Sequence, residues 1–365
     1  MQSLGIIANP ASGKDIRRLV SFATVIDNNE KVNIVKRIVL AAQAFGVERV
    51  YFMPDTFQMG LTVQEELTQH GVLTADIAVL EMFCGGSAAD STVAAKRMEE
   101  LGVDCIAVLG GDGTSRAVAK GVVRTPLVPL STGTNNVYPQ MVEGTVAGMA
   151  AASLGRLADP YSVCIQDKRI EVWLNGQMVD LALIDAVISD DTYVGARAIW
   201  NSSRIRTIVV SRCHPATIGF SAVAGSVRII RDTDPGGLAI DLASEGSAEG
   251  VSMAAGSAAG DLAAAGSAAE DLAAGVHTPG DRTPEVRKVK AAIAAGVVEE
   301  IGIREVRRLD DDEWLRLTME QRAMVALDGE REVKVQAGDE LAFRICRNGP
   351  WRVRIEEAVA MMMAG

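Results

Sequence analysis

A glycine-rich turn between a strand and a helix is the feature that most constrains this chain. Residues 104–109 are an apolar run that predicts a buried strand, and residues 114–123 predict a helix. Between them the sequence reads Gly-Gly-Asp-Gly-Thr at 110–114, and its three glycines let the backbone approach a ligand closely. We expect Thr114 to cap the helix, whose first N–H groups carry partial positive charge. The turn therefore predicts a phosphate-binding site.

Asp112 is the exception within this turn. A carboxylate among groups that attract anions is normally there to hold a metal or to take a proton. The alternative is an ordinary strand-to-helix turn that uses Gly and Asp as turn formers. We therefore treat Asp112 as the candidate catalytic carboxylate.

Two more polar turns follow predicted strands in the first half of the chain. Asn9, Ser12 and Lys14 come after an apolar run at 4–8 and offer an amide, a hydroxyl and a cation to phosphate oxygens. Residues 131–139 follow a second run and supply hydroxyls and amides suited to phosphate or ribose. The alternative for the first is an ordinary turn with a helix cap, and the alternative for the second is a loop that is polar because it is exposed.

Strands and helices alternate over residues 1–158. This alternation predicts an α/β domain with a doubly wound parallel sheet. Ligands of such sheets bind at the carboxyl ends of the strands, where all three polar turns fall. We expect the helix that follows the last of these turns to span residues 143–157.

Strand-like runs joined by short turns replace the alternation of strands and helices near residue 159. This change predicts a second, mainly antiparallel β domain over 159–365. Asn175-Gly176 is a strong hairpin signal, and Asp328-Gly329 is a further turn. We expect residues 286–317 to be mixed or helical, and residues 234–282 to be a mobile surface insertion. Within it, residues 246–275 are three Ala-, Gly- and Ser-rich decapeptide repeats, for which weak helix is the competing interpretation.

Composition narrows the function classes. A net charge of −11 and a pI near 4.9 argue against nucleic-acid and anionic-membrane partners. The five Cys are scattered and the three His form no cluster, so neither a disulfide framework nor a zinc site is expected. No leader and no apolar run of membrane-spanning length is seen, which favours a cytoplasmic protein.

Four motifs in order resemble the superfamily of NAD kinases and diacylglycerol or sphingosine-type lipid kinases. They are Asn-Pro-x-Ser-Gly at 9–13, Gly-Gly-Asp-Gly-Thr at 110–114, Gly-Thr-Asn-Asn at 133–136 and Asp-Gly-Glu at 328–330. The opening of the chain is similar in particular to the NAD-kinase-like group encoded with acetoin-catabolism enzymes. The resemblance covers nearly all of the chain outside the repeats, and implies an α/β domain and a β-sandwich-like domain with the site between them.

The resemblance also implies ATP and Mg²⁺ as cofactors and the reaction of NAD with ATP to give NADP and ADP. The implied catalytic residues are Asp112 and Glu330. The implied phosphate- and nucleotide-binding residues are Asn9, Ser12, Gly110, Gly111, Gly113, Thr114, Thr134 and Asn136. The implied acceptor-binding residues are Asn135 and Asp185. No residue is assigned as a metal ligand.

Asp185 marks a departure from the NAD kinase pattern. Those enzymes carry an Asn-Glu pair on a β-domain strand that holds the dinucleotide, and the matching place here is Ile184-Asp185. The acid is shortened and the amide is lost, which puts NAD in question as the acceptor. The alternative is that Asp185 is a strand residue facing the domain interface.

Three hypotheses remain open at this stage. The first is an NAD kinase-like phosphotransferase, and the second has a lipid or a small diol linked to acetoin catabolism as the acceptor. The third is a nucleotide-sensing protein without catalysis, since fold does not imply function. The partner expected is a small hydroxyl-bearing molecule, the donor is ATP or polyphosphate, and the resemblance implies a homo-oligomer.

Overall fold

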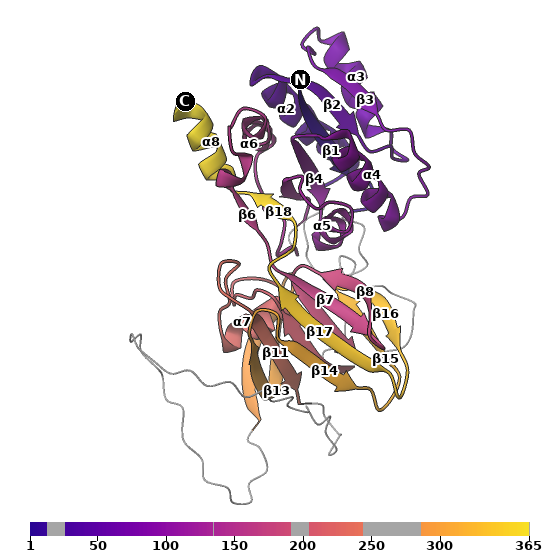
Figure 1. Ribbon diagram of the computed structural model, residues 1–365, viewed down its shortest axis with the longest axis vertical. Coiled ribbons are helices and arrows are strands. Elements are labelled where there is room, and N and C mark those ends of the chain that lie inside the picture. Colours follow the sequence, from indigo (N-terminus) through magenta and orange to yellow (C-terminus); the bar gives the residue numbers. More distant parts are fainter. Residues whose placement is uncertain (13–25, 134, 191–203, 244–285, 365) are drawn as a thin grey trace, which may run out of the picture.

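The structure is a computed structural model that describes residues 1–12, 26–133, 135–190, 204–243 and 286–364 (Figure 1). Its helices are α2 (Asn28–Ala44), α3 (Met59–Gln69), α4 (Ala88–Leu101), α5 (Asp112–Ala119), α6 (Gly144–Leu154), α7 (Phe220–Val227) and α8 (Ile355–Ala364), with a 3-10 turn at Pro160–Val163. Of these described helices, none has the length and apolar character needed to cross a membrane.

The N-terminal part is a doubly wound α/β sheet, as the alternation of elements predicts. Its strands are β1 (Gln2–Ala8), β2 (Val47–Phe52), β3 (Asp76–Val79), β4 (Cys105–Gly110), β5 (Leu127–Ser131), β6 (Cys164–Gln166) and β18 (Trp351–Val353). Among the described residues their order is β3-β2-β1-β4-β5-β18-β6, and every neighbouring pair is parallel except β18 with β6. The carboxyl ends of β1, β4 and β5 therefore meet at one edge.

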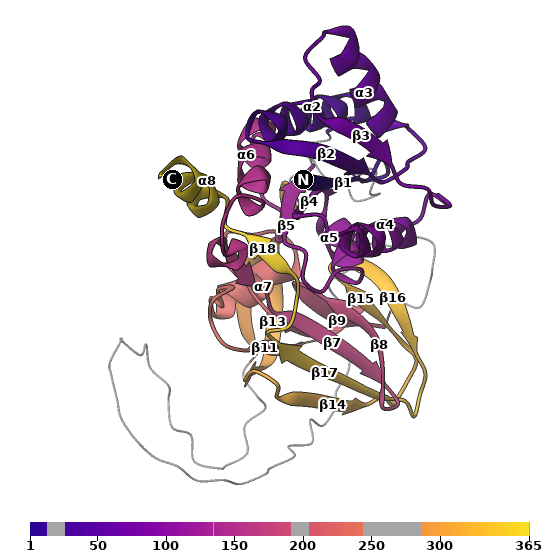
Figure 2. The same ribbon diagram turned by 45° about the horizontal axis from the view of Figure 1, so that its top comes forward.

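Helices cover both faces of this sheet (Figure 2). Apolar residues of α2, α3, α6 and α8 pack on one face, and those of α4 and α5 pack on the other. Strands β4 and β5 are buried along their whole length, which fits apolar runs without alternation. The glycine-rich turn thus begins at the end of β4, a central strand that is covered by helices on both faces.

The C-terminal part consists of two antiparallel sheets. The first contains β9 (Asp185–Ser189), β10 (Ile205–Val210), β11 (Gly237–Leu242), β12 (Arg287–Ala294), β13 (Val297–Leu309), β15 (Ala323–Leu327) and β16 (Glu330–Val335). The second contains β7 (Arg169–Leu174), β8 (Gln177–Ala182), β14 (Trp314–Thr318) and β17 (Glu340–Cys346). Side chains from both sheets, among them Val172, Val209 and Phe343, share one buried core.

Two expectations about this part are wrong. The expected mixed or helical stretch at 286–317 is the strands β12, β13 and most of β14. Pairing of β13 with β11 and β12, and of β14 with β17, overrides the helix preference of its alanines. The insertion does not begin at residue 234, since residues 237–242 form the buried strand β11. The repeats at 246–275 lie outside the described residues.

Segments from beyond residue 158 also belong to the first sheet. Strands β6 and β18 pair with each other, and β18 pairs with β5. Helix α8 then packs against the same core as α2 and α6. The last described residues therefore return to the N-terminal sheet, and a domain division between 158 and 159 stays a prediction.

Glu171 on β7 holds the second of these antiparallel sheets together by charge. Its carboxylate accepts hydrogen bonds from Arg344 on the paired strand β17 at 2.6 Å and from Arg169 at 2.6 Å. Burial acts to raise the pKa of Glu171, but these two guanidinium groups outweigh it and bring the pKa down from 4.5 to about 2.

We expect part of the stability to be lost between about pH 4.5 and pH 2. In the unfolded chain Glu171 takes up its proton near its ordinary pKa, whereas the folded protein resists protonation until about pH 2. Its stabilisation is therefore complete above pH 4.5 and lost as the pH falls through the lower value. Urea denaturation of Glu171→Gln should give a difference from wild type that shrinks over this range. An exposed control, Glu48→Gln, should follow the wild-type profile, and a difference independent of pH would contradict the account.

Candidate functional site

The turns after β1, β4 and β5 meet at the carboxyl edge of the first sheet. The Asn9 amide donates a hydrogen bond to Thr114 Oγ1 at 3.2 Å. Ser12 Oγ donates to the Asn9 carbonyl at 2.7 Å and lies 3.2 Å from Thr132 Oγ1. The structure thus brings Asn9, Ser12 and Thr114 together, as predicted, and adds Thr132, which the sequence analysis did not single out.

The glycine-rich turn starts its helix two residues earlier than expected. Gly111 is the N-cap and Asp112 begins α5, so the prediction that Thr114 caps this helix is wrong. Gly111 has extended backbone at this cap, and the Thr114 hydroxyl instead accepts from Asn9. A Cβ on Gly110 would lie 2.5 Å from Thr114 Cβ, so only glycine permits this tight strand-to-helix turn.

Asp112 holds the loop that follows β5. Its half-buried carboxylate accepts hydrogen bonds from the Tyr138 N–H at 2.7 Å and from the Val137 N–H at 3.0 Å. Two N–H donors fix the orientation of this carboxylate at the first residue of α5, where the helix dipole favours a negative charge.

Asn135 and Asn136 belong to the same loop. Asn136 donates to Ser131 Oγ at 2.8 Å, and its Oδ1 lies 2.8 Å from where a Cβ of Gly111 would be. Asn135 Oδ1 is buried without a hydrogen-bond partner within the described part of the chain. Thr134 lies outside the described residues. The loop therefore packs the Asn136 amide against the glycine-rich turn, and the Asn135 side-chain oxygen remains available as a hydrogen-bond acceptor.

A hairpin of the C-terminal part brings Glu330 to the same place. A Cβ on Gly113 would lie 2.6 Å from Glu330 Oε1, so this carboxylate rests on the glycine backbone of α5. The tight turn before it uses positive φ at Asp328 (49°) and Gly329 (81°). Asp112 and Glu330, which are 218 positions apart in the numbering of the chain, thus flank Gly113.

Asp328 anchors this hairpin from within. Its carboxylate is buried and accepts hydrogen bonds from the N–H groups of Leu183 and Ile184 at 2.9 and 2.8 Å. Burial raises the pKa of Asp328, against the opposing effect of Arg116 and of these N–H donors. Asp185 begins β9 and is 7% exposed; its N–H donates to the Asp328 carboxylate, and its carbonyl accepts from the Asp328 N–H. Asp185 therefore lies beside the Asp-Gly-Glu turn, and its facing a domain interface stays a prediction.

Arg116 is a site residue that the sequence analysis missed. Its guanidinium, 3% exposed, pairs with Asp180 at 3.2 Å and Glu332 at 2.7 Å and lies 3.9 Å from Glu330. Burial acts to lower the pKa of Arg116, and the surrounding carboxylates outweigh this and raise it. A charged residue four positions after Asp112, within an apolar helical stretch, was the available signal.

Lys31 is the second missed cation. It is 1% exposed, and its ammonium donates to the carbonyls of Asn9 and Ser12 at 2.9 and 2.8 Å. Lys31 shares a helix face with the buried Val35 and Ile38, which was the signal in the sequence. The expected cation Lys14 lies outside the described residues, so Lys31 is the lysine seen at this turn.

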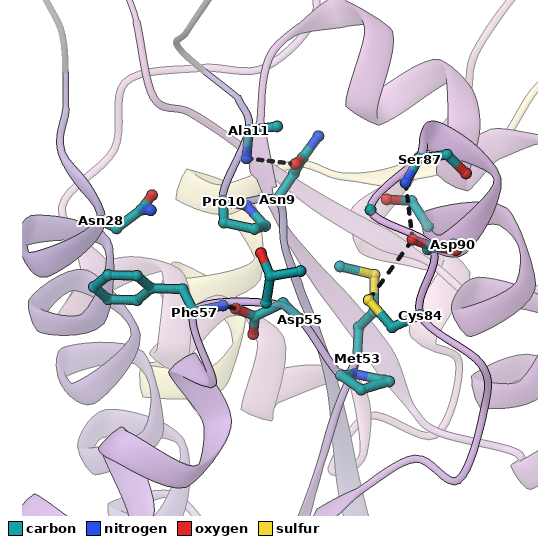
Figure 3. Close-up of a pocket in the computed structure, with 14 residues that line it drawn as sticks. Asn9, Pro10, Ala11, Asn28, Met53, Asp55, Phe57, Cys84, Ser87 and Asp90 are labelled. Carbon is teal, nitrogen blue, oxygen red and sulfur yellow. Dashed lines mark hydrogen bonds between the residues drawn. The ribbon is translucent and has the colours of Figure 1, made fainter.

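A cavity of about 170 Å³ opens beside Asn9 (Figure 3). The ends of β1 and β2 and the loop before α4 form its walls. Asp55, Cys84 and Asp90 line it, and Asp90 accepts hydrogen bonds from the N–H groups of Gly85 and Ser87. Burial raises the pKa of Asp55. The cavity is thus polar on one side and adjoins the glycine-rich turn through Asn9.

Family models match both the N-terminal and the C-terminal part of this chain. Residues 4–156 match the family model of the ATP-NAD kinase N-terminal domain, and residues 168–271 and 257–348 match that of the acetoin catabolism protein X C-terminal domain. Acetoin catabolism protein X of Cupriavidus necator is 38% identical over 257 residues, which cover 67% of this chain and 71% of that protein. These matches confirm the resemblance that the four motifs indicated.

Solved structures are similar at a more distant level. Yeast NADH kinase complexed with NADH gives a TM-score of 0.46 at 13% identity, covering 100% of this chain and 88% of that one. A diacylglycerol kinase from Bacillus anthracis gives a TM-score of 0.42 at 12% identity, covering 96% of each chain.

Replacing Arg116 by Met should destabilise the protein strongly. The change leaves the largely buried Asp180 carboxylate and the partly exposed Glu332 carboxylate without this cation, and it should cost about 1–3 kcal/mol in the free energy of unfolding. Lys120→Met is the matched control, because Lys120 pairs with the same Asp180 at 2.6 Å but is 32% exposed. Its cost should stay below about 1 kcal/mol. Equal costs in urea denaturation would contradict the central role given to Arg116.

Proposed function

The chain belongs to the family of acetoin catabolism protein X, and from this premise we propose that it is an ATP-dependent kinase. It transfers a phosphoryl group to an alcohol of a small molecule, and NAD is its first candidate acceptor. The observation that carries the proposal is the meeting of Asp112 and Glu330 at Gly113, beside the N-terminus of α5. Phosphoryl transfer needs positioned phosphates and a carboxylate near the attacking hydroxyl, and this turn offers a helix N-terminus for the first need and two carboxylates for the second.

The residues present fit a nucleotide. The N-terminus of α5 offers backbone N–H groups to a phosphate, and the absence of side chains at Gly110, Gly111 and Gly113 lets Thr114, Asn136 and Glu330 pack directly against the turn. Asn135 has a buried acceptor without a partner among the described residues, as a ligand-binding amide would. The cavity beside Asn9 is smaller than the roughly 300–1,000 Å³ of whole-ligand pockets, so it would take only part of the nucleotide.

The residues also fit Mg²⁺ held mainly by the nucleotide. No group of three or more His, Cys, Asp or Glu among the described residues is arranged to hold a metal. Mg²⁺ is usually bound by one or two carboxylates together with substrate phosphates, and Asp112 and Glu330 can supply these. When bound, the ion would neutralise charge on the transferred phosphate.

Asp112 takes the proton of the acceptor hydroxyl in this proposal. The N–H groups of Val137 and Tyr138 set the orientation of this carboxylate. It can therefore accept the proton without first reorienting. Glu330 assists as the second base or metal partner. Asn9, Ser12, Thr114 and Asn136 bind the nucleotide, together with Thr134 of the same loop.

Asp185 favours a small diol as the second candidate acceptor. Ile184 is fully buried in an apolar cluster with Ala119 and Tyr138, so it offers no polar group at the place of the amide that holds NAD in the kinases resembled. Asp185 itself is a short acid with 7% exposure. A diol needs fewer polar contacts than a dinucleotide, so the loss of this amide counts less against a diol acceptor.

Asp112→Asn should leave the fold intact and reduce turnover by on the order of 10²-fold or more, because the amide cannot accept the proton. The Asn oxygen can still accept a hydrogen bond from the loop, so the urea midpoint should change little. The measurement is NADP formation from ATP, Mg²⁺ and NAD by wild type and variant. Unchanged turnover would remove Asp112 from the mechanism, and ATP binding without any product would favour another acceptor or a nucleotide sensor.

Gly113→Ala should lower turnover about tenfold while stability stays within about 1 kcal/mol. Alanine favours the helix by roughly 0.5–1 kcal/mol, but its methyl group would displace the Glu330 carboxylate that lies 2.6 Å away. Ser115→Ala on the same turn is the control, since the Ser115 hydroxyl has no hydrogen-bond partner among the described residues. Full activity of Gly113→Ala would show that the position of Glu330 is unimportant.

A further inference from the structure

The two chain connections between the sheets of the N- and C-terminal parts run side by side. One is Asp167-Lys168, between β6 and β7, and the other is residues 347–350, between β17 and β18 (Figure 1). They are hydrogen-bonded to each other, since the Asp167 N–H donates to the Pro350 carbonyl at 3.0 Å and the Gly349 N–H donates to the Asp167 carbonyl at 2.9 Å. We call these two connections the hinge.

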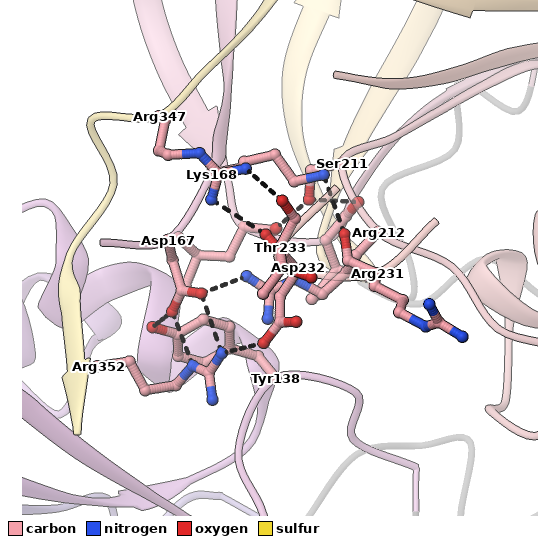
Figure 4. A network of polar contacts seen from close by, with 12 residues as sticks. Tyr138, Asp167, Lys168, Ser211, Arg212, Arg231, Asp232, Thr233, Arg347 and Arg352 are labelled. Carbon is pink, nitrogen blue, oxygen red and sulfur yellow. Dashed lines mark hydrogen bonds and ion pairs between the residues drawn. The ribbon is translucent and has the colours of Figure 1, made fainter. Parts of the chain in front are cut away.

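The Asp167 carboxylate is the centre of a buried polar network at this hinge (Figure 4). It is completely buried and accepts hydrogen bonds from Arg212 at 2.7 Å, from Arg352 Nε at 2.8 Å and from the Tyr138 hydroxyl at 2.8 Å. Arg212 follows β10 of the C-terminal part, and Arg352 lies on β18 of the first sheet. One carboxylate therefore joins both parts of the molecule and the loop after β5.

At neutral pH the Asp167 side chain is an ionised carboxylate and the Tyr138 side chain is a neutral hydroxyl. Burial acts to raise the pKa of Asp167, but the two guanidinium groups outweigh it and lower the pKa. Burial and the Asp167 carboxylate raise the pKa of Tyr138 well above its ordinary value. Tyr138 thus remains a hydroxyl donor and Asp167 an acceptor, and the guanidinium carbons of Arg212 and Arg352 lie 5.3 and 5.9 Å from the Tyr138 ring centre.

Tyr138 is bonded to the candidate active site at its other end. Its backbone N–H donates to Asp112 Oδ1 at 2.7 Å, while its hydroxyl reaches Asp167. A single buried residue therefore spans the distance from the glycine-rich turn to the hinge. The same loop carries Asn135 and Asn136, so a shift of Tyr138 moves the groups that face the nucleotide.

We propose that Tyr138 and Asp167 are positioning residues, which set the Asp112 carboxylate and the loop at 135–138 from the hinge. A packed apolar core would join the two parts at lower desolvation cost than a buried carboxylate with two guanidinium groups. What such a network adds is one defined geometry, because each hydrogen bond fixes a direction as well as a distance. The part of the proposal that concerns catalysis rests on the kinase function proposed above.

Tyr138→Phe tests this proposal because it removes one hydroxyl and keeps the buried ring. We expect hydrogen–deuterium exchange of the amides in residues 135–138 to become about tenfold faster, since the loop loses a hydrogen bond to a charged group. Tyr161→Phe is the matched control, because it also removes a hydroxyl hydrogen bond, to the Arg124 carbonyl at 3.1 Å, away from the loop. Exchange in 135–138 should not change in this control. Asp167→Asn should raise it at least as much as Tyr138→Phe.

The kinetic readout separates positioning from a general loss of stability. In Tyr138→Phe we expect kcat to fall about tenfold while the KM for ATP stays within about twofold, because the glycine-rich turn at 110–114 is untouched. Unchanged exchange in 135–138 overturns the proposal whatever the kinetics, and so does an unchanged kcat in an active enzyme. If the wild type transfers no phosphate, the proposed kinase function fails. Faster exchange in Tyr138→Phe would then still support the proposal that Tyr138 and Asp167 fix the position of the loop.

Discussion

The buried guanidinium of Arg116 is the interaction on which the assembly of the site depends. It sits on α5, directly after the glycine-rich turn, and pairs with Asp180 on β8 and Glu332 on β16. The first helix turn of the α/β sheet is thereby fixed against two strands of the antiparallel part. Because Glu330 precedes Glu332 by two residues on the same strand, this pairing also sets where the Glu330 carboxylate meets Gly113.

Both parts of the molecule contribute to the candidate site, and each needs the other. The α/β sheet supplies the turn, the helix N-terminus and the loop after β5, which are suited to hold phosphates. The antiparallel part supplies Glu330 through a hairpin that Asp328 ties to the start of β9. Without this hairpin the turn would have one carboxylate instead of two.

Short sequence patterns predict the turns and strands that are encoded locally. They do not reveal the site residues whose roles depend on contacts with distant parts of the chain. The glycine-rich turn, the parallel sheet and the motif at Asn9 follow from short patterns, and the fold confirms the sheet. Arg116, Lys31 and Tyr138 were missed as site residues because their roles depend on partners far away in the chain. The stretch at 286–317 was misjudged for the same reason, since its strands exist through pairing with β11 and β17.

The most direct test of the account is transfer of the labelled γ-phosphate of ATP to an added alcohol, with Mg²⁺ and with NAD and small diols as acceptors. The account predicts that the label appears in a phosphate ester of one acceptor, and that the rate falls sharply in both Asp112→Asn and Glu330→Gln. A wild-type protein that binds ATP but leaves the label in ATP with every acceptor would contradict it. So would transfer that survives the loss of both carboxylates.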